Sequence, residues 1–192
     1  MPLPTHKVTI CGIPELSLHC SVGISHVLSI IDTHEPRPPA LDHYSAIEHE
    51  LIRFDDVVAE YPGFEACTPA HIVQVLEFGE RVHARPDSHV LVHCHAGISR
   101  STAAMAMLLA QTDPDGDETA IFDRLVSIRP QAWPNSRMIG FADRLLSRKG
   151  RLNAALARLY ARQLAARPDL EETMRRHGRG REVDMALSGS TA

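Results

Sequence analysis

The sequence is poor in the features that mark membrane proteins and disulfide-rich proteins. None of its apolar runs approaches the roughly 20 residues that a membrane-spanning helix needs, and residues 1–7 lack the apolar core of a secretory signal peptide. Its four cysteines are scattered without Cys-x-x-Cys spacing, so we predict neither a zinc site nor a disulfide framework. We therefore expect a cytoplasmic protein that does not bind membranes, in a compartment that keeps thiols reduced.

Strong positive charge is also missing. The chain of 192 residues has a formal net charge of −4, which gives no support for a nucleic-acid-binding protein. Its hydrophobic content of 44% is enough for one α/β domain with a proper core. We predict a domain over residues 1–167, followed by a tail over residues 168–192.

One stretch, residues 93–101, has the sequence His-Cys-His-Ala-Gly-Ile-Ser-Arg-Ser. An apolar run over residues 90–92 precedes it and a mostly apolar run over residues 102–109 follows it, a pattern typical of a strand, a tight loop and a buried helix. Backbone N–H groups at the start of such a helix point into the loop, and the helix dipole favours negative charge there. The stretch therefore predicts an anion-binding loop.

Cys94 lies at the mouth of this predicted loop. Helix N-termini and nearby guanidinium groups stabilise the thiolate form of cysteine, so we expect Cys94 to be a nucleophile at neutral pH. Arg100 has a planar guanidinium that can hold two oxygens of a bound oxyanion. Gly97 allows the loop to curl, because glycine tolerates positive φ and brings no Cβ against the ligand. Ser101 can donate its hydroxyl to the Cys94 sulfur and help it leave.

The pattern His-Cys-x-x-Gly-x-x-Arg-Ser closely resembles the signature of the cysteine-dependent protein tyrosine phosphatases, and residues 97–101 are most similar to the dual-specificity-type branch. The resemblance implies a phosphoric monoester hydrolase that acts on phosphotyrosine, and also on phosphoserine or phosphothreonine, through a thiophosphoryl-cysteine intermediate. It implies a phosphorylated protein or a small phosphate ester as substrate, and no cofactor. The residues expected to bind the phosphate or another oxyanion are His95, Ala96, Gly97, Ile98, Ser99 and Arg100.

Three further side chains are expected to support this site. Adjacent residues on a strand or tight loop point in different directions, so His93, Cys94 and His95 are poor candidates for three ligands of one metal ion, and we predict no metal. The resemblance implies instead that His93 lies beneath the loop, while His95 is expected at the pocket rim. Asn135 is expected to cap the helix that follows it, and the resemblance implies that it also positions the hydrolytic water.

A pair of acids, Asp55 and Asp56, follows a predicted strand over residues 50–54. In the resembled family, an aspartate upstream of the cysteine protonates the leaving oxygen and later activates water. We favour Asp56 for this role, because residues 52–56 resemble the family's pattern of a strand followed by an acid when the second acid takes the catalytic position. Asp55 and then Glu60 are the alternatives.

Apolar runs predict strands over residues 7–11, 27–32, 50–54 and 89–92. A helix capped by Thr68 lies before the last strand, and later helices are expected over 100–111, 117–128 and 145–164, the last interrupted near Gly150. The order strand, helix, strand implies a right-handed crossover, so we predict an α/β fold with a mostly parallel sheet of about four to five strands flanked by helices. The resemblance makes it protein-tyrosine-phosphatase-like, with an extra C-terminal helix.

Beyond Arg175 the chain carries a basic cluster and then small polar residues, a composition typical of disorder. Three other functions stay open on the sequence. A phospho-binding module without catalysis would keep Arg100 and lose the nucleophile or the acid. A thiol-dependent arsenate reductase or a sulfurtransferase would also use a cysteine beside an oxyanion loop, and the reductase needs a resolving cysteine, for which Cys67 is the candidate. A scaffold would use the leucine-rich C-terminal helix.

Overall fold

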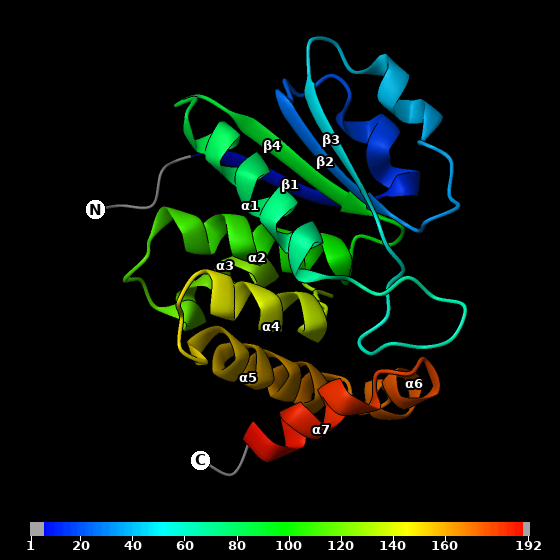
Figure 1. Cartoon of the computed structure of the whole chain (residues 1–192), viewed down its shortest axis with the longest axis vertical. Helices are drawn as coiled ribbons and strands as arrows, with labels where there is room; N and C mark the ends of the chain where they lie inside the picture. Colours follow the sequence, from blue (N-terminus) through cyan, green and yellow to red (C-terminus); the bar gives the residue numbers. More distant parts are fainter. Residues whose placement is uncertain (1–5, 190–192) are drawn as a thin grey trace.

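The computed structural model describes residues 6–189. These residues form a four-stranded sheet in the order β1-β4-β2-β3, and every neighbouring pair of strands is parallel (Figure 1). The predicted α/β fold with a mostly parallel sheet is confirmed, with the number of strands at the lower end of the expected range. The strands are β1 (Lys7–Gly12), β2 (His26–Ile31), β3 (Glu48–Arg53) and β4 (His89–Cys94).

The sequence of each strand matches its place in the sheet. The central strands β2 and β4 are buried at all six and at five of six residues, as expected for apolar parallel strands that are covered on both faces. β3 is an edge strand, and among its residues Ile52 alone is fully buried. Because all four strands are parallel, their carboxyl ends meet at one edge, where open α/β sheets bind their ligands.

A layer of helices covers one face of the sheet (Figure 1). α2 is buried from Arg100 to Ala110 and contacts the sheet as well as its neighbouring helices, which makes it the centre of the layer. Two predicted N-caps, Thr68 and Asn135, are confirmed at the starts of α1 and α4. The helices are α1 (Pro69–His83), α2 (Arg100–Thr112), α3 (Glu118–Ile128), α4 (Ser136–Leu145) and α5 (Arg151–Ala166).

Two short 3₁₀ helices, η1 (Ile13–His19) and η2 (Pro39–His43), contribute a second, smaller core. Leu16 and Leu41 are buried there against sheet residues that include Leu91. The Tyr44 hydroxyl donates to the Leu16 carbonyl at 2.6 Å and joins the two segments. η1 follows β1 directly, so its first turn lies at the carboxyl edge of the sheet.

The chain continues past α5 into α6 (Leu170–Arg176) and α7 (Gly180–Gly189). The disorder expected beyond Arg175 is therefore wrong for α7, while residues 190–192 lie outside the described part of the chain. α7 packs along α5 (Figure 1). Val183 and Ala186, three positions apart, are both fully buried and give α7 an apolar stripe. Within residues 6–189, every helix is too short or too polar to span a bilayer.

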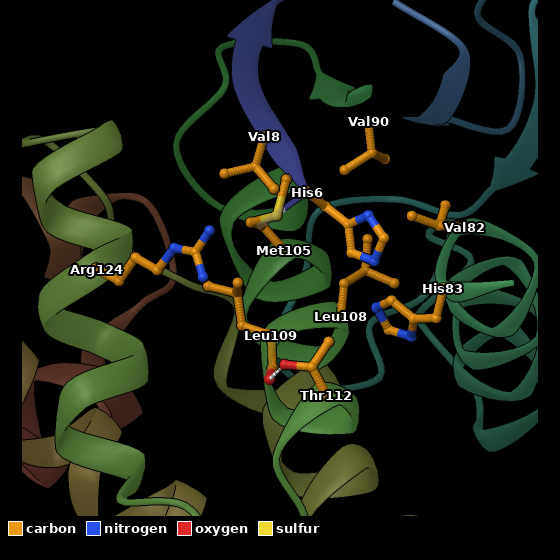
Figure 2. Close-up of a pocket in the computed structure, with 10 residues that line it drawn as sticks. All are labelled: His6, Val8, Val82, His83, Val90, Met105, Leu108, Leu109, Thr112 and Arg124. Carbon is orange, nitrogen blue, oxygen red and sulfur yellow. Dashed lines mark hydrogen bonds between the residues drawn. The ribbon is translucent and has the colours of Figure 1, made fainter. Parts of the chain in front are cut away.

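A small cavity lies near the amino ends of β1 and β4, away from Cys94 (Figure 2). Val8 and Val90 line it from the sheet, and the rings of His6 and His83 stack beside it with their centroids 5.4 Å apart. Its volume of about 20 Å³ is enough for roughly one water molecule. A cavity of this size has no room for a substrate.

Candidate active site

Cys94 is the last residue of β4, at the carboxyl edge of the sheet. It is 2% exposed, and its Sγ lies 3.2 Å from the hydroxyl oxygen of Ser101. Residues 95–99 form the loop between β4 and α2, which begins at Arg100. The strand, tight loop and buried helix that the sequence predicts are all present, and Ser101 contacts the sulfur as expected.

The five carbonyl groups of the loop, from residue 95 to residue 99, are all bound by the body of the protein. In a trans peptide the N–H points away from the carbonyl that precedes it, so the N–H groups of residues 96–100 are turned toward the opposite side, the pocket. The loop therefore offers hydrogen-bond donors to an anion. The donors to the carbonyls are Ile13 N (to His95), Arg129 (to Ala96 and Gly97), Trp133 N (to Ile98) and Asn135 N (to Ser99), at 2.9–3.3 Å.

Arg129 braces this loop from outside. Its Nε donates to the Gly97 carbonyl at 3.1 Å and its Nη2 to the Ala96 carbonyl at 2.9 Å. The same guanidinium forms a bidentate ion pair with Glu15 of η1, with both contacts at 2.8 Å. The hydrogen bond from Arg129 holds the pKa of Glu15 below its usual value, so the pair stays ionised at neutral pH. The loop is thereby tied to the end of β1.

Gly97 has the positive φ that the sequence predicts, +71°. The predicted reason for a glycine here needs correction. A Cβ on Gly97 would lie 2.5 Å from the carbonyl carbon of Cys11 and 2.7 Å from its oxygen. The space that a side chain would need is thus occupied by the end of β1, whereas the predicted conflict is with the ligand.

Arg100 is buried, with 2% of its side chain exposed. Its Nη1 forms an ion pair with Asp32 Oδ1 at 2.6 Å and donates to the Phe54 carbonyl at 2.6 Å. Asp32 follows β2 and Phe54 follows β3, so the ends of two strands fix the guanidinium. Its Nε is buried and has no hydrogen-bond partner within the described part of the chain. A buried donor of this kind needs an acceptor, and a bound oxyanion would supply one.

The two histidines beside Cys94 have different surroundings. His93 is fully buried, and its Nε2 lies 2.5 Å from the hydroxyl oxygen of Ser29, which in turn lies 2.8 Å from His49 Nε2. Burial lowers the pKa of His93 to about 4, so the ring is neutral at pH 7. The side chain of His95 is 49% exposed at the rim, with its Nδ1 3.8 Å from Asp32 Oδ2.

Asp56 lies against the same loop. Its Oδ1 accepts hydrogen bonds from the Ser99 hydroxyl at 2.8 Å and from Asn135 Nδ2 at 3.0 Å, and it lies 2.7 Å from Arg179 Nη2. Asn135 also caps α4 by accepting from Met138 N at 3.1 Å. Asn135 therefore combines the capping role with a contact to the candidate acid.

The charge state of Asp56 follows from these neighbours. Partial burial acts to raise the pKa of the carboxyl. The positive charges of Arg179 and Arg100, together with the hydrogen bonds from Asn135 and Ser99, act in the other direction and outweigh it. The pKa of Asp56 therefore lies below its usual value, and the carboxylate form is the stable one at neutral pH.

The two alternative acids have other partners. Asp55 Oδ2 accepts from Glu65 N at 2.7 Å, and the Asp55 N–H donates to the Glu65 carbonyl at 2.7 Å, so Asp55 closes the base of the segment between β3 and α1. Glu60 is 83% exposed in its side chain and pairs with Arg137 at 2.9 Å. Of the three acids, Asp56 is the one that lines the pocket beside Cys94.

The pocket has a volume of about 370 Å³. We call its two sides the loop wall and the C-terminal wall, and Asp56 and Trp133 lie between them. The loop wall consists of Cys94, His95, Ala96, Ile98, Ser99 and Arg100. The C-terminal wall consists of Thr173, Met174, His177 and Arg179.

Several residues of the site were not predicted from the sequence. Asp32 ends a predicted strand, but no motif predicts a role for it or for Arg129. Arg179 and Glu182 lie in the segment whose composition is typical of disorder. Within residues 6–189, no group of three or more His, Cys, Asp or Glu side chains is arranged to hold a metal ion.

Comparisons with known proteins agree with this geometry. A family model described as protein-tyrosine phosphatase matches residues 60–137. The chain is 33% identical over 132 residues to the MAP kinase phosphatase with leucine-rich repeats protein 3 of Dictyostelium discoideum, a match that covers 69% of this chain and 14% of that protein. The chain thus spans about a seventh of that relative's length.

Two solved structures share the fold. Human DUSP28 is 15% identical with a TM-score of 0.56, and the match covers 74% of this chain and 89% of that one. DUSP15 is 20% identical with a TM-score of 0.55, and the match covers 85% of this chain and 94% of that one. The signature loop, its parallel-sheet setting and these similarities agree with one another. Over residues 60–137 the chain is similar to the protein-tyrosine phosphatase family, and it shares its fold with these two solved structures.

Proposed function

We propose that the protein hydrolyses phosphate monoesters, with phosphotyrosine in proteins as its preferred substrate and phosphoserine or phosphothreonine as further ones. One observation supports this most directly. A single pocket combines the Cys94 thiol, the unpartnered Nε of buried Arg100 and the Asp56 carboxyl group. These are a nucleophile, a cation for the transferred phosphoryl group and a proton donor.

In the first step, the thiolate of Cys94 attacks phosphorus in line with the ester oxygen, so that an S–P bond forms while the P–O bond breaks. The N–H groups of the loop and Arg100 stabilise the equatorial oxygens. Asp56, in its protonated form, transfers its proton to the departing oxygen, which leaves as a neutral phenol or alcohol.

In the second step, water attacks the phosphorus of the thiophosphoryl-cysteine. Asp56, now a carboxylate, takes a proton from this water as the new P–O bond forms and the S–P bond breaks. Inorganic phosphate leaves, and the Ser101 hydroxyl stabilises the returning Cys94 thiolate by a hydrogen bond. Asn135 holds the Asp56 carboxyl group toward the pocket in both steps. The scheme uses no metal and no cofactor.

The preference for phosphotyrosine rests on the surroundings of the loop. Ile98 and Trp133 line the pocket beside the loop, and Met174 lines it from the C-terminal wall. Apolar and aromatic side chains favour a flat aromatic ring, both by burial of apolar area and by ring stacking. A serine or threonine ester would leave part of this apolar surface exposed to water.

A phosphopeptide panel tests the proposal. One peptide sequence would carry phosphotyrosine, phosphoserine or phosphothreonine at the same position, and phosphate release would be measured for the wild type, C94S and C20S. We expect the largest kcat/KM for phosphotyrosine, no release by C94S and unchanged release by C20S. Cys20 is a suitable control, because its thiol donates to the Ser17 carbonyl at 3.2 Å and lies outside the pocket.

Two results would contradict the proposal. Release of phosphate by C94S at the wild-type rate would exclude the covalent route. Binding of the phosphopeptides by the wild type without release would make the protein a phospho-binding module. An arsenate reductase is not favoured, because burial raises the pKa of Cys67 to about 12 and its thiol donates to the Thr68 carbonyl at 3.6 Å. These are features of a structural thiol.

A further inference from the structure

The turn between α6 and α7 brings a cation from the end of the chain into the active site. Arg179 lies in this turn and is 8% exposed. Gly178, with a φ of +72°, precedes it, and the Arg179 N–H donates to the Met174 carbonyl at 2.8 Å, which fixes the turn. Burying a guanidinium costs free energy unless other groups compensate its charge. The groups that contact Arg179 therefore indicate its role.

One nitrogen of Arg179, Nη2, contacts Asp56 at two points. It lies 2.7 Å from the carboxylate Oδ1 and donates to the backbone carbonyl of Asp56 at 3.0 Å. It also donates to the Ser99 hydroxyl at 3.1 Å. Because one group holds both the side chain and the backbone of Asp56, it fixes the direction of the carboxylate and the position of its segment against the loop.

Glu182 of α7 holds Arg179 in place. Its Oε1 lies 3.4 Å from Arg179 Nη1 and accepts from Ser136 N at 2.7 Å. Its Oε2 accepts from the Trp133 Nε1–H at 2.6 Å, and Glu182 is fully buried. α7 is thus fastened to the segment that carries Asn135. Because Arg179 is buried and contacts both Asp56 and Glu182, its guanidinium keeps this position, whereas a flexible surface arginine would lose it.

We infer that Arg179 is a positioning residue for Asp56, and that the segment from α6 to α7 is a working part of the active site. The inference rests on the proposed function, in which Asp56 is the proton donor and acceptor. It assigns to the C-terminal wall an influence on the chemical step, in addition to contact with the substrate.

The charges around Asp56 determine the direction of this influence. Arg179 and Arg100 both favour the carboxylate over the acid. The first step needs the acid form, so Arg179 moves the fall of kcat/KM at high pH to a lower pH. The second step needs the carboxylate, which Arg179 stabilises and aims. The other polar or titratable groups around Asp56 or in the pocket include Cys94, His95, Ser99, Asn135, Tyr160, Thr173, His177 and Glu182.

The test compares R179Q and R179K with R176Q in the full chain. Arg176 is a matched control, because it is exposed and pairs with Glu172 on the surface of α6. The pH dependence of kcat/KM would be measured with phenyl phosphate, whose leaving group needs a proton, and with p-nitrophenyl phosphate, whose leaving group needs one much less. Thermal unfolding of each variant would establish that it is folded.

With phenyl phosphate, we expect R179Q to shift the fall of kcat/KM at high pH, which we call the high-pH limb, to a pH about one unit higher. The reason is that an adjacent cation lowers a carboxyl pKa by about 1–3 units. We expect its kcat to fall by roughly tenfold, less than the 100-fold that a misplacement of about 1 Å can cost. R179K keeps the charge and should keep the limb near the wild-type position. R176Q should match the wild type, and p-nitrophenyl phosphate should show smaller changes.

A folded R179Q with an unmoved limb would reduce Arg179 to a structural clamp and overturn the inference. D56N, measured in the same series, separates this result from a failure of the proposed function. If D56N removes the limb while R179Q leaves it unmoved, the inference alone fails. If D56N retains the limb, Asp56 is not the acid, and the proposed mechanism fails together with the inference.

A second measurement does not depend on the stability of R179Q. The carboxyl carbon of Asp56 can be titrated by NMR in the wild-type protein and assigned by its loss in D56N. We expect a pKa below the ordinary aspartate value of about 3.9. A value at or above it would overturn the inference, because an Asp56 held by Arg179 as described is stabilised as the carboxylate.

Discussion

The two walls of the active-site pocket are built in different ways. The loop wall is local, because it consists of one strand end, one short loop and one helix start. The carbonyls of the loop accept hydrogen bonds from the body of the protein, and these bonds hold it in place. The C-terminal wall comes from a distant part of the chain, and Arg179 is 80 residues beyond its contact Ser99. That wall depends on side-chain contacts of Arg179, Glu182 and Trp133.

The two walls are therefore expected to serve different purposes, one common to all substrates and one specific to some of them. In the proposed mechanism, the loop wall supplies the groups that any phosphate monoester needs, a nucleophile and donors to the phosphoryl oxygens. The C-terminal wall would contact the remainder of the substrate and the proton donor. Substitutions in the loop wall should therefore affect every substrate, whereas those in the C-terminal wall should affect substrates unequally.

R100K tests the role of the loop wall and should have the largest effect. Lysine keeps the charge but cannot bind Asp32 and a phosphoryl oxygen with the same planar group, so we expect kcat/KM for p-nitrophenyl phosphate to fall by roughly 100- to 1000-fold. R158K is the matched control, because Arg158 donates to the Thr119 hydroxyl on the exposed surface. An R100K activity within tenfold of the wild type would contradict the role of the loop wall.

Asp56 lies between the two walls, and D56N tests it against D55N. We expect D56N to lower kcat/KM for phosphotyrosine by about 100-fold and to remove the fall in activity at high pH. The sign follows from the lowered pKa of Asp56. Its acid form is lost as pH rises through that pKa, so wild-type activity on this ester should be highest at acidic pH. D55N should keep the wild-type profile, and the reverse order would move the role to Asp55.

G97A tests how much the position of the loop contributes to the free energy of unfolding. Gly97 and Gly150 both have positive φ, but a Cβ on Gly150 would meet nothing within 4 Å, whereas one on Gly97 would collide with Cys11. We expect G150A to lower the free energy of unfolding by about 1–2 kcal/mol and G97A to lower it by more than about 3 kcal/mol. Chemical denaturation measures both. Equal losses would show that the contact with β1 has no energetic weight.

M174A should have the smallest effect and should be selective for the substrate. Removing part of the C-terminal wall should raise KM for a phosphotyrosine peptide by about three- to tenfold, in line with the apolar area lost, with kcat unchanged. M185A is the matched control, because Met185 is also partly buried but does not line the pocket. The same KM in both variants would mean that the substrate does not use the apolar wall.

The loop wall could be predicted because its chemistry requires neighbouring residues in a fixed order. Cys94, Gly97 and Arg100 appear where the motif predicts them, and the apolar runs on either side define their strand and helix. Asp32 shows the limit of this reasoning. It follows a strand that was predicted correctly, but its contact with Arg100 depends on the order β1-β4-β2-β3, which chain order does not reveal.

The C-terminal wall was missed for a different physical reason. A cluster of arginines near the end of a chain is typical of a solvated tail, and the sequence around Arg179 offers no motif. The available signals were weaker: the glycine at position 178 between two short helices, and the spacing of Val183 and Ala186. Both are explained by the packing of α7 on α5, a contact that single-chain periodicity cannot identify.

The bound carbonyls of residues 95–99 also affect how fast an anion can enter the site. Each carbonyl already has its partner inside the protein, so no peptide has to turn over before a phosphate docks. We expect the rate of association to be set by diffusion and by attraction to the positive loop. We therefore expect the loop to receive its ligand without a change in the shape of its backbone.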